Sequence, residues 1–241
     1  MIPRIDSVAL TASTNDDVMA LARAGASEGY WLRADVQSGG RGRQGRQWQS
    51  PVGNLYASTL VRLRAEDPSA ASLAFVIGIA AHVTLAPLGG PHELKLKWPN
   101  DLLLNGAKCA GMLLEREKDG VVLGIGVNLA SAPEIAGRLT ASFHDGSAAP
   151  FDPAALLVDL ARNFAEKLAR WRAEPLQRTL ADWESRAHAI GTPLSVSLSA
   201  DEKLEGHYDG LASDGALFLR MTDGTRRQVH AADVDIIRER I

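Results

Sequence analysis

The alternation of apolar and polar residues predicts strands and helices that follow one another through the first 189 residues. Apolar residues at every second position are typical of half-buried strands, and recurrence every three or four positions is typical of helices. After a short N-terminal strand, strands are expected at residues 30–37, 54–63, 93–98 and 120–130, a hairpin at 101–115, and helices at 15–25, 67–86, 153–171 and 175–189.

Local signals at the ends of these elements agree with the periodicity. Ser13 and Thr14 are natural N-caps for the first helix, and Gly25 is a natural stop. The Asn105-Gly106 pair is a typical two-residue turn between antiparallel strands. The first 189 residues therefore predict an α+β domain with a sheet flanked by helices.

The pattern changes near Gly191. Residues 190–241 contain four or five short apolar runs separated by turn signals such as Ser-Asp-Gly and Thr-Asp-Gly. This spacing predicts a small C-terminal β-barrel domain. We therefore expect two domains, at residues 1–189 and 190–241.

Composition narrows the class of protein. A net charge of -3 argues against a dedicated duplex-DNA binder, whose affinity would come mostly from phosphate neutralisation. The single cysteine, Cys109, excludes an internal disulfide and fits a reducing compartment. The N-terminus does not resemble a signal peptide, and the apolar run 73–88 falls short of the roughly 20 residues that a membrane span needs. A cytoplasmic protein with a buried helix at this run is expected.

Two strands combine glycine with polar residues. In 120–130, alternate residues from Val121 form a core face, and the opposite face carries Gly124, Gly126 and Asn128, which would leave a groove with a polar end. The same alternation puts Lys108, Ala110 and Met112 together, with Gly111 between them. Tight helix packing on the glycines and a solvated lysine are the alternatives.

A glycine-rich cationic segment precedes these strands. Residues 37–51, QSGGRGRQGRQWQSP, contain three arginines and four glycines. Guanidinium groups bind carboxylates and phosphates in a bidentate manner, and glycines let backbone N–H groups approach an anion. We expect Arg41, Arg43 and Arg46 to form a mobile loop that becomes ordered on an anionic ligand. A solvated surface loop is the alternative.

Lysine, asparagine and aspartate meet in the segment KWPND, residues 97–101. A lysine here could contact a phosphate while Asn100 and Asp101 face the same opening. An exposed turn would also explain the pair.

Five motifs occur in the order seen in biotin protein ligases: STN (13–15), QSGGRGRQGRQW (37–48), KWPND (97–101), KCAGMLLE (108–115) and GIGVNL (124–129). The chain resembles the short form of that family, which lacks an N-terminal DNA-binding domain. The resemblance implies a mixed sheet flanked by helices, of the class II synthetase-like biotin/lipoate ligase type, followed by an SH3-like barrel. It implies that biotin and ATP with Mg²⁺ give biotinyl-adenylate, and that biotin then passes to a lysine of a biotin carboxyl carrier domain, such as that of acetyl-CoA carboxylase.

The resemblance also implies roles for individual residues. Lys108 and Arg43 would be catalytic, with Lys108 bridging the biotin carboxyl and the α-phosphate. The expected biotin-binding residues are Ser13, Thr14, Asn15, Gln37, Gly40, Arg41, Gly42, Arg43, Lys108, Gly111, Gly124 and Gly126. The expected nucleotide-binding residues are Arg43, Trp48, Lys97, Asn100, Asp101, Lys108 and Asn128. No metal-ligating residue is assigned.

Two departures from the family pattern affect the expectations. The motifs begin at Ser13, which leaves no room for a helix-turn-helix domain, so no sequence-specific DNA binding is expected. Some members carry an adenine-stacking tryptophan after the last motif, where the nearest aromatic residue here is Phe143. A lipoate or octanoate ligase or transferase and a non-catalytic biotin sensor are the alternative functions, no membrane association is expected, and a homodimer is left open.

Overall fold

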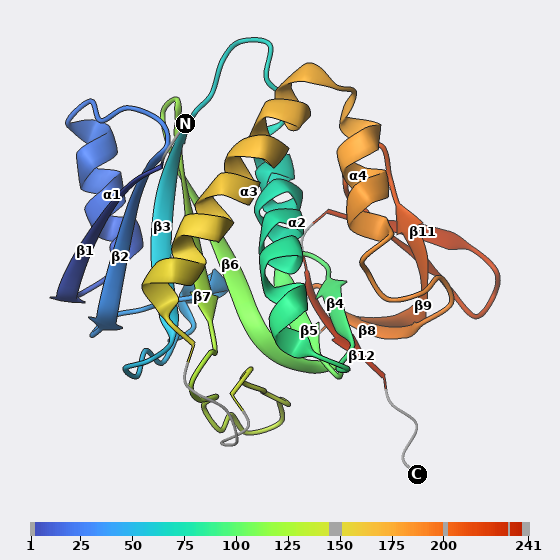
Figure 1. The fold of residues 1–241 in the computed structure, drawn as a ribbon. Coiled ribbons are helices and arrows are strands. Elements are labelled where there is room, and N and C mark those ends of the chain that lie inside the picture. Colours follow the sequence, from blue (N-terminus) through green and yellow to red (C-terminus); the bar gives the residue numbers. More distant parts are fainter. Residues whose placement is uncertain (1–2, 145–150, 200–201, 231, 238–241) are drawn as a thin grey trace.

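The computed structural model describes residues 3–144, 151–199, 202–230 and 232–237, which form two sheets and four α-helices (Figure 1). The first sheet contains β1 (Arg4–Thr11), β2 (Tyr30–Gln37), β3 (Leu55–Arg62), β4 (Leu94–Lys97), β5 (Asp101–Leu104), β6 (Ala107–Glu117) and β7 (Gly120–Val127). The second contains β8 (Pro193–Ser197), β9 (Lys203–Leu211), β10 (Leu217–Arg220), β11 (Arg226–Val229) and β12 (Asp233–Ile236). The helices are α1 (Thr14–Arg23), α2 (Leu73–Leu85), α3 (Pro153–Ala173) and α4 (Leu176–Glu184).

The first sheet is mixed and has helices on both faces. Its strand order is β1-β2-β3-β7-β6-β5-β4, with β1 and β2 parallel and the other neighbours antiparallel. Helix α1 covers one face, where Val18 packs with Leu60 and Val122. Helices α2 and α3 lie on the other face (Figure 1). The α+β prediction is confirmed. Nearly all residues of β7 are buried, because alternate side chains point to opposite faces and helices cover both faces of the sheet.

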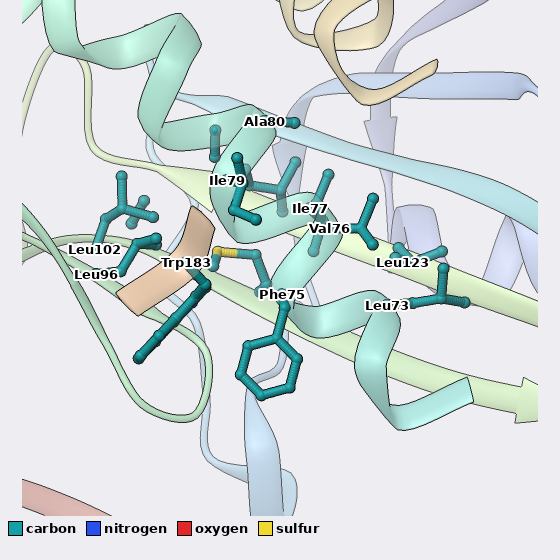
Figure 2. Packing of buried hydrophobic residues seen from close by; sticks show 14 of the residues in the cluster. Leu73, Phe75, Val76, Ile77, Ile79, Ala80, Leu96, Leu102, Leu123 and Trp183 are labelled. Atoms are coloured by element: carbon teal, nitrogen blue, oxygen red, sulfur yellow. The ribbon is translucent and has the colours of Figure 1, made fainter. Parts of the chain in front are cut away.

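Helix α2 is the centre of the main hydrophobic core. It is buried on nearly every side, because it packs against the sheet, α3 and α4, and this accounts for its lack of a polar face (Figure 2). The apolar helical run Ala70–Gly89 is long enough to cross a membrane by length and composition, but 61% of its most apolar window is buried inside the protein. The expectation of a buried helix here agrees with that packing.

The second sheet is small and entirely antiparallel, with the order β11-β10-β9-β8-β12. Its end strands β11 and β12 do not pair with each other in the described residues. Leu194, Tyr208 and Leu217 belong to the same core cluster as helix α2, so the two sheets share one continuous interior. The C-terminal residues form the small antiparallel sheet that was expected, and it is packed firmly against the rest of the chain. The division into domains at residues 1–189 and 190–241 stays a prediction.

Two predicted helix boundaries were wrong. Helix α4 ends at Glu184 and not near residue 189, because the following residues pair with β4: the Leu96 N–H donates to the Arg186 carbonyl at 2.9 Å. Helix α2 begins at Leu73 and not at Asp67. The Asp67 carboxylate accepts from the Arg64 N–H and from the Arg172 guanidinium, so it does not cap a helix.

Candidate active site

A cavity of about 380 Å³ opens on the α1 face of the first sheet, beyond the C-terminal part of β7. Its floor comes from β6 and β7, one end from the N-terminus of α1, and its sides from residues 41–49, 133–140 and strand β12. All predicted site residues except Gly40 line it. Gly40 lies just behind, where an added Cβ would be 2.8 Å from the Trp48 carbonyl oxygen.

One end of the cavity is a network of neutral polar groups. Ser13 caps α1, and Thr14 donates its N–H to Gln37 Oε1 at 2.8 Å. The Thr14 and Ser58 hydroxyls are 2.7 Å apart, and Ser58 donates to Asn15 Oδ1 at 2.6 Å. These side chains are held by one another, so this end offers fixed hydrogen-bonding groups without net charge.

The glycine groove predicted on β6 and β7 exists, and two side chains lie in it. Gly111 and Gly126 are cross-strand partners, and the indole of Trp48 lies against both. A Cβ on Gly126 would be 2.5 Å from the ring, and one on Gly124 would be 2.2 Å from Asn15 Oδ1. The glycines therefore give room to Trp48 and to Asn15 of helix α1, so close packing of a helix, the alternative to a ligand groove, applies at Gly124.

Lys108 points into this cavity because of an irregularity in β6. The pairing of β5 with β6 shifts between Leu102 and Leu103, so one extra residue of β6 is accommodated. Cys109 and Ala110 are therefore both in the core, and Lys108 shares the cavity side with Gly111. The prediction that Lys108, Ala110 and Met112 share a face was wrong for Lys108, because strict alternation fails across a bulge.

Two lysines share one buried carboxylate at the cavity floor. Asp101 Oδ1 lies 2.5 Å from Lys108 Nζ, and Oδ2 lies 3.3 Å from Lys97 Nζ. Burial would raise the pKa of the Asp101 carboxyl, but the two lysines lower it below its usual value. Lys97 also donates to the Val234 carbonyl at 2.6 Å, which attaches β12 to the site.

Residues 40–48 form a short hairpin, called here the flap. The Trp48 N–H donates to the Gly40 carbonyl and the Gly42 N–H to the Arg46 carbonyl, while Gln44 and Gly45 make the tip with positive φ. The flap turns back over the cavity and brings its three arginines to different partners.

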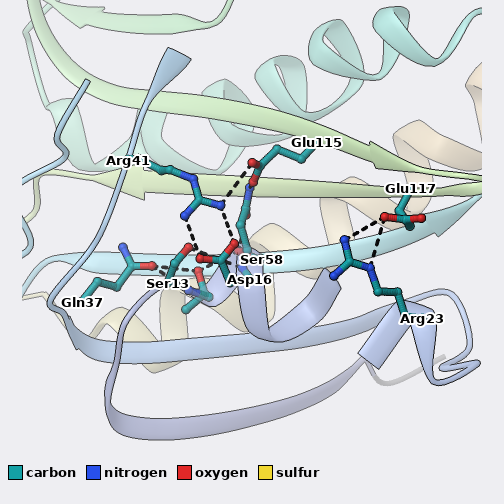
Figure 3. A network of polar contacts seen from close by, with 10 residues as sticks. Ser13, Asp16, Arg23, Gln37, Arg41, Ser58, Glu115 and Glu117 are labelled. Atoms are coloured by element: carbon teal, nitrogen blue, oxygen red, sulfur yellow. Dashed lines mark hydrogen bonds and ion pairs between the residues drawn. The ribbon is translucent and has the colours of Figure 1, made fainter. Parts of the chain in front are cut away.

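Arg43 and Arg46 bind the C-terminal strand. Arg46 Nη2 lies 2.7 Å from Asp233 Oδ1, and Arg43 Nη1 donates to the Ala232 carbonyl at 3.0 Å. Burial lowers the pKa of Arg43, while Asp233 opposes that effect. Arg41 instead turns toward α1 and β6, where it pairs with Asp16 and Glu115 (Figure 3).

The two asparagines that were expected to bind the nucleotide, Asn100 and Asn128, make different contacts. The Asn100 side-chain amide donates to the Met112 backbone carbonyl, and the Asn100 backbone carbonyl accepts the Met112 N–H at 2.9 Å. Asn100 therefore attaches the turn between β4 and β5 to β6. Asn128 donates to the Ala141 carbonyl at 3.2 Å, and its Oδ1 is buried without a partner. The Trp48 Nε1 is likewise buried and unpaired, so one acceptor and one donor are available to a ligand.

Comparisons with known proteins identify the family of this chain. Residues 9–130 match the model of the "Biotin/lipoate A/B protein ligase family". A biotin–[acetyl-CoA-carboxylase] ligase of Paracoccus denitrificans is 37% identical over 94% of this chain and 98% of its own length. The chain is a member of the biotin/lipoate protein ligase family. The enzyme of the same name from Mycobacterium tuberculosis is 36% identical over 96% of this chain and 88% of its own.

The fold of this biotin/lipoate ligase family member matches solved structures as well. A biotin protein ligase from Aquifex aeolicus, in complex with biotin and ATP, superposes with a TM-score of 0.84 over 97% of this chain and 99% of its own, at 24% identity. At that identity the likeness concerns the fold.

Sequence reasoning about this ligase family member missed several site residues. Ser58 could have been found from β3, because it alternates with Tyr56 and Leu60 on the α1 side. Glu115 ends the motif KCAGMLLE but received no role, and Asp233 lies in the C-terminal strand without a local motif. Phe143, the aromatic residue nearest to the last motif in the sequence, is part of the hydrophobic core. Among the described residues that line the cavity, the one aromatic residue is Trp48.

Proposed function

We propose that this protein is an ATP-dependent biotin–[biotin carboxyl-carrier protein] ligase. Biotin and ATP combine to give biotinyl-adenylate and pyrophosphate, and a carrier lysine ε-amine then attacks the acyl carbon and releases AMP. The observation that carries the proposal is charge: six cations and three carboxylates line the cavity, a net of +3 in a chain of net -3. Such a cavity suits two anionic partners that must be brought together.

The two ends of the cavity suit the two substrates. The neutral network around Thr14, Asn15 and Gln37 would hold the uncharged ureido ring, since fixed amide and hydroxyl groups match its donors and acceptors. Lys108 and Lys97, which share one carboxylate, leave net positive charge where a carboxylate approaches a phosphate. Their fixed charge lowers the energy of the transition state without solvent reorganisation.

Mg²⁺ would enter with the triphosphate. Among residues 3–144, 151–199, 202–230 and 232–237, no group of three or more His, Cys, Asp or Glu side chains could hold a metal ion. Mg²⁺ usually binds substrate phosphates and waters with one or two carboxylates, and Asp101 and Asp233 lie at the cavity. The ion would neutralise phosphate charge, and the protein would supply few of its ligands.

The head-group end favours biotin over lipoate. A dithiolane ring offers no strong donor or acceptor, so it would make no hydrogen bonds with Thr14, Asn15 and Gln37, whereas the ureido ring would. Both relatives above, at 36 and 37% identity, are named biotin ligases. Their names also support a carrier domain of acetyl-CoA carboxylase as the acceptor.

The test is a carrier-labelling assay. A purified biotin carboxyl carrier domain is incubated with ATP, Mg²⁺ and labelled biotin, with an equimolar lipoate competitor, and labelling is followed by mass spectrometry. The proposal expects addition of biotin to one lysine and no addition to a carrier in which that lysine is arginine. Preferential lipoyl transfer would support the lipoate alternative, and biotin binding without transfer would support the sensor.

A further inference from the structure

The three flap arginines have different electrostatic surroundings. Arg43 and Arg46 share the single carboxylate of Asp233, so two cations face one anion. Arg41 is the reverse case, because one guanidinium lies between the carboxylates of Asp16 and Glu115 (Figure 3). Arg41 and its two carboxylate partners together carry a net charge of -1, so Arg41 attracts a substrate carboxylate or phosphate less than Arg43 and Arg46 do.

The contacts of Arg41 are numerous for a partly exposed side chain. Its Nη1 donates to Asp16 Oδ2 at 2.7 Å, Nη2 donates to the other oxygen, and Nη2 also lies 3.2 Å from Glu115 Oε1. The hydrogen bonds from Arg41 lower the pKa of Asp16, and those to Asp16 and Glu115 raise the pKa of Arg41. A bidentate pair of this kind fixes orientation as well as distance.

Glu115 also connects this group to the head-group end of the cavity. Its Oε2 accepts from Asn15 Nδ2 at 2.7 Å, and Asn15 in turn accepts from Ser58. One carboxylate of β6 therefore contacts both the flap and the neutral network below it.

We propose that Asp16 and Glu115 are positioning residues that clasp Arg41 and thereby hold the flap over the cavity while biotinyl-adenylate is inside. Arg41 then acts as the attachment point of the flap, and Arg43, Arg46, Lys97 and Lys108 are the cations that meet the substrate anions. This inference rests on the proposed function for its substrate and on the contacts above for its geometry.

A competing interpretation predicts effects of the opposite sign. If Arg41 were the ligand of the substrate anion, Asp16 would compete with that anion. Removing the Asp16 charge would then strengthen retention of the adenylate. If Asp16 acts as a clasp, removing its charge weakens retention.

The experiment compares Asp16→Asn, Glu115→Gln and Arg41→Ala with the matched control Glu117→Gln. Glu117 lies on the same strand and pairs with Arg23 of the same helix, without a flap contact (Figure 3). Dissociation of biotinyl-adenylate is measured by chase, and the single-turnover rate of pyrophosphate release is measured separately. We expect about 5-fold faster dissociation for the three variants, since partly exposed charge pairs contribute about 1 kcal/mol. For Asp16→Asn, whose side chain does not line the cavity, pyrophosphate release should stay within about 2-fold of wild type.

A double-mutant cycle tests whether Asp16 acts through Arg41. In the Arg41→Ala background, Asp16→Asn should have no further effect on dissociation. An additive effect, slower dissociation for Asp16→Asn, or equal rates for Glu115→Gln and Glu117→Gln would overturn the clasp.

A second measurement needs no substrate. Trypsin cleavage after Arg43 and Arg46, followed by mass spectrometry, should be faster in Asp16→Asn and Glu115→Gln than in Glu117→Gln. If the wild type forms no adenylate while these cleavage rates differ as expected, the proposed function fails and the clasp stands. Equal cleavage rates in all three variants would contradict the clasp whatever the activity.

Discussion

Lys108→Ala is the substitution that most directly probes the charge of the site. Its Nζ lies 2.5 Å from Asp101 and 5.5 Å from the centre of the Trp48 ring, and the side chain is 27% exposed. It is thus held between the floor and the flap, where a carboxylate and a phosphate would meet. Loss of one preorganised donor to a transition state typically costs about 3 to 4 kcal/mol, so adenylation should slow by about 10²- to 10³-fold.

The assay for Lys108→Ala separates chemistry from binding and folding. Pyrophosphate release under single turnover reports adenylation, and calorimetry with biotin alone reports affinity. That affinity should change less, because the substitution leaves the neutral network around Thr14, Asn15 and Gln37 intact. Asp101 retains Lys97 as a partner, so the variant should fold. Lys95→Ala, at a lysine outside the cavity, is the control. A Lys108→Ala enzyme within a few-fold of wild type would refute the role assigned to this ammonium.

Two further substitutions test the floor and the interior. Gly126→Ala would place a methyl group 2.5 Å from the Trp48 ring, which would have to move within the cavity. The KM for biotin should then rise about 10-fold or more, while the melting temperature stays close to that of wild type because Trp48 belongs to the flap and not to the core. An unchanged KM would contradict this arrangement of Trp48 and Gly126. Burial lowers the pKa of His188 to about 4, with Lys97 contributing. In the unfolded chain His188 has its ordinary pKa of about 6.5, so below that pH the unfolded chain binds a proton that the folded protein does not yet bind. The free energy of unfolding therefore decreases as the pH falls from about 6.5 toward 4, by up to about 3 kcal/mol. Urea unfolding should show that the free energy of unfolding decreases less between pH 7.5 and pH 5 in His188→Phe than in the wild type. An equal decrease in both proteins would exclude His188 as the source of the pH dependence.

Sequence patterns predicted most strands and the grouping of the motif residues around one cavity, because these depend on local periodicity. The alternation of Val121, Leu123 and Ile125 with Val122 and Gly124 assigns the two faces of β7 directly. The motifs lie together because β6 and β7 are neighbours and because α1 begins directly after Ser13, an N-cap that is visible in the sequence.

The features that were missed depend on contacts between distant segments. The bulge in β6 that turns Lys108 into the cavity involves its pairing with β5, and alternation within one strand does not reveal it. Asp233 meets Arg46 across 187 positions, and Arg41 meets Glu115 across 74. The partners of the arginines therefore required the tertiary structure, although their anion-binding chemistry did not.

The most direct test of the account is the dependence of pyrophosphate release on both substrates. The purified protein is mixed with ATP and Mg²⁺, with and without biotin, and pyrophosphate and biotinyl-adenylate are quantified over one turnover. The account predicts one equivalent of each per active site with biotin and neither without it. Pyrophosphate release that is independent of biotin, or biotin binding with no adenylate, would contradict it.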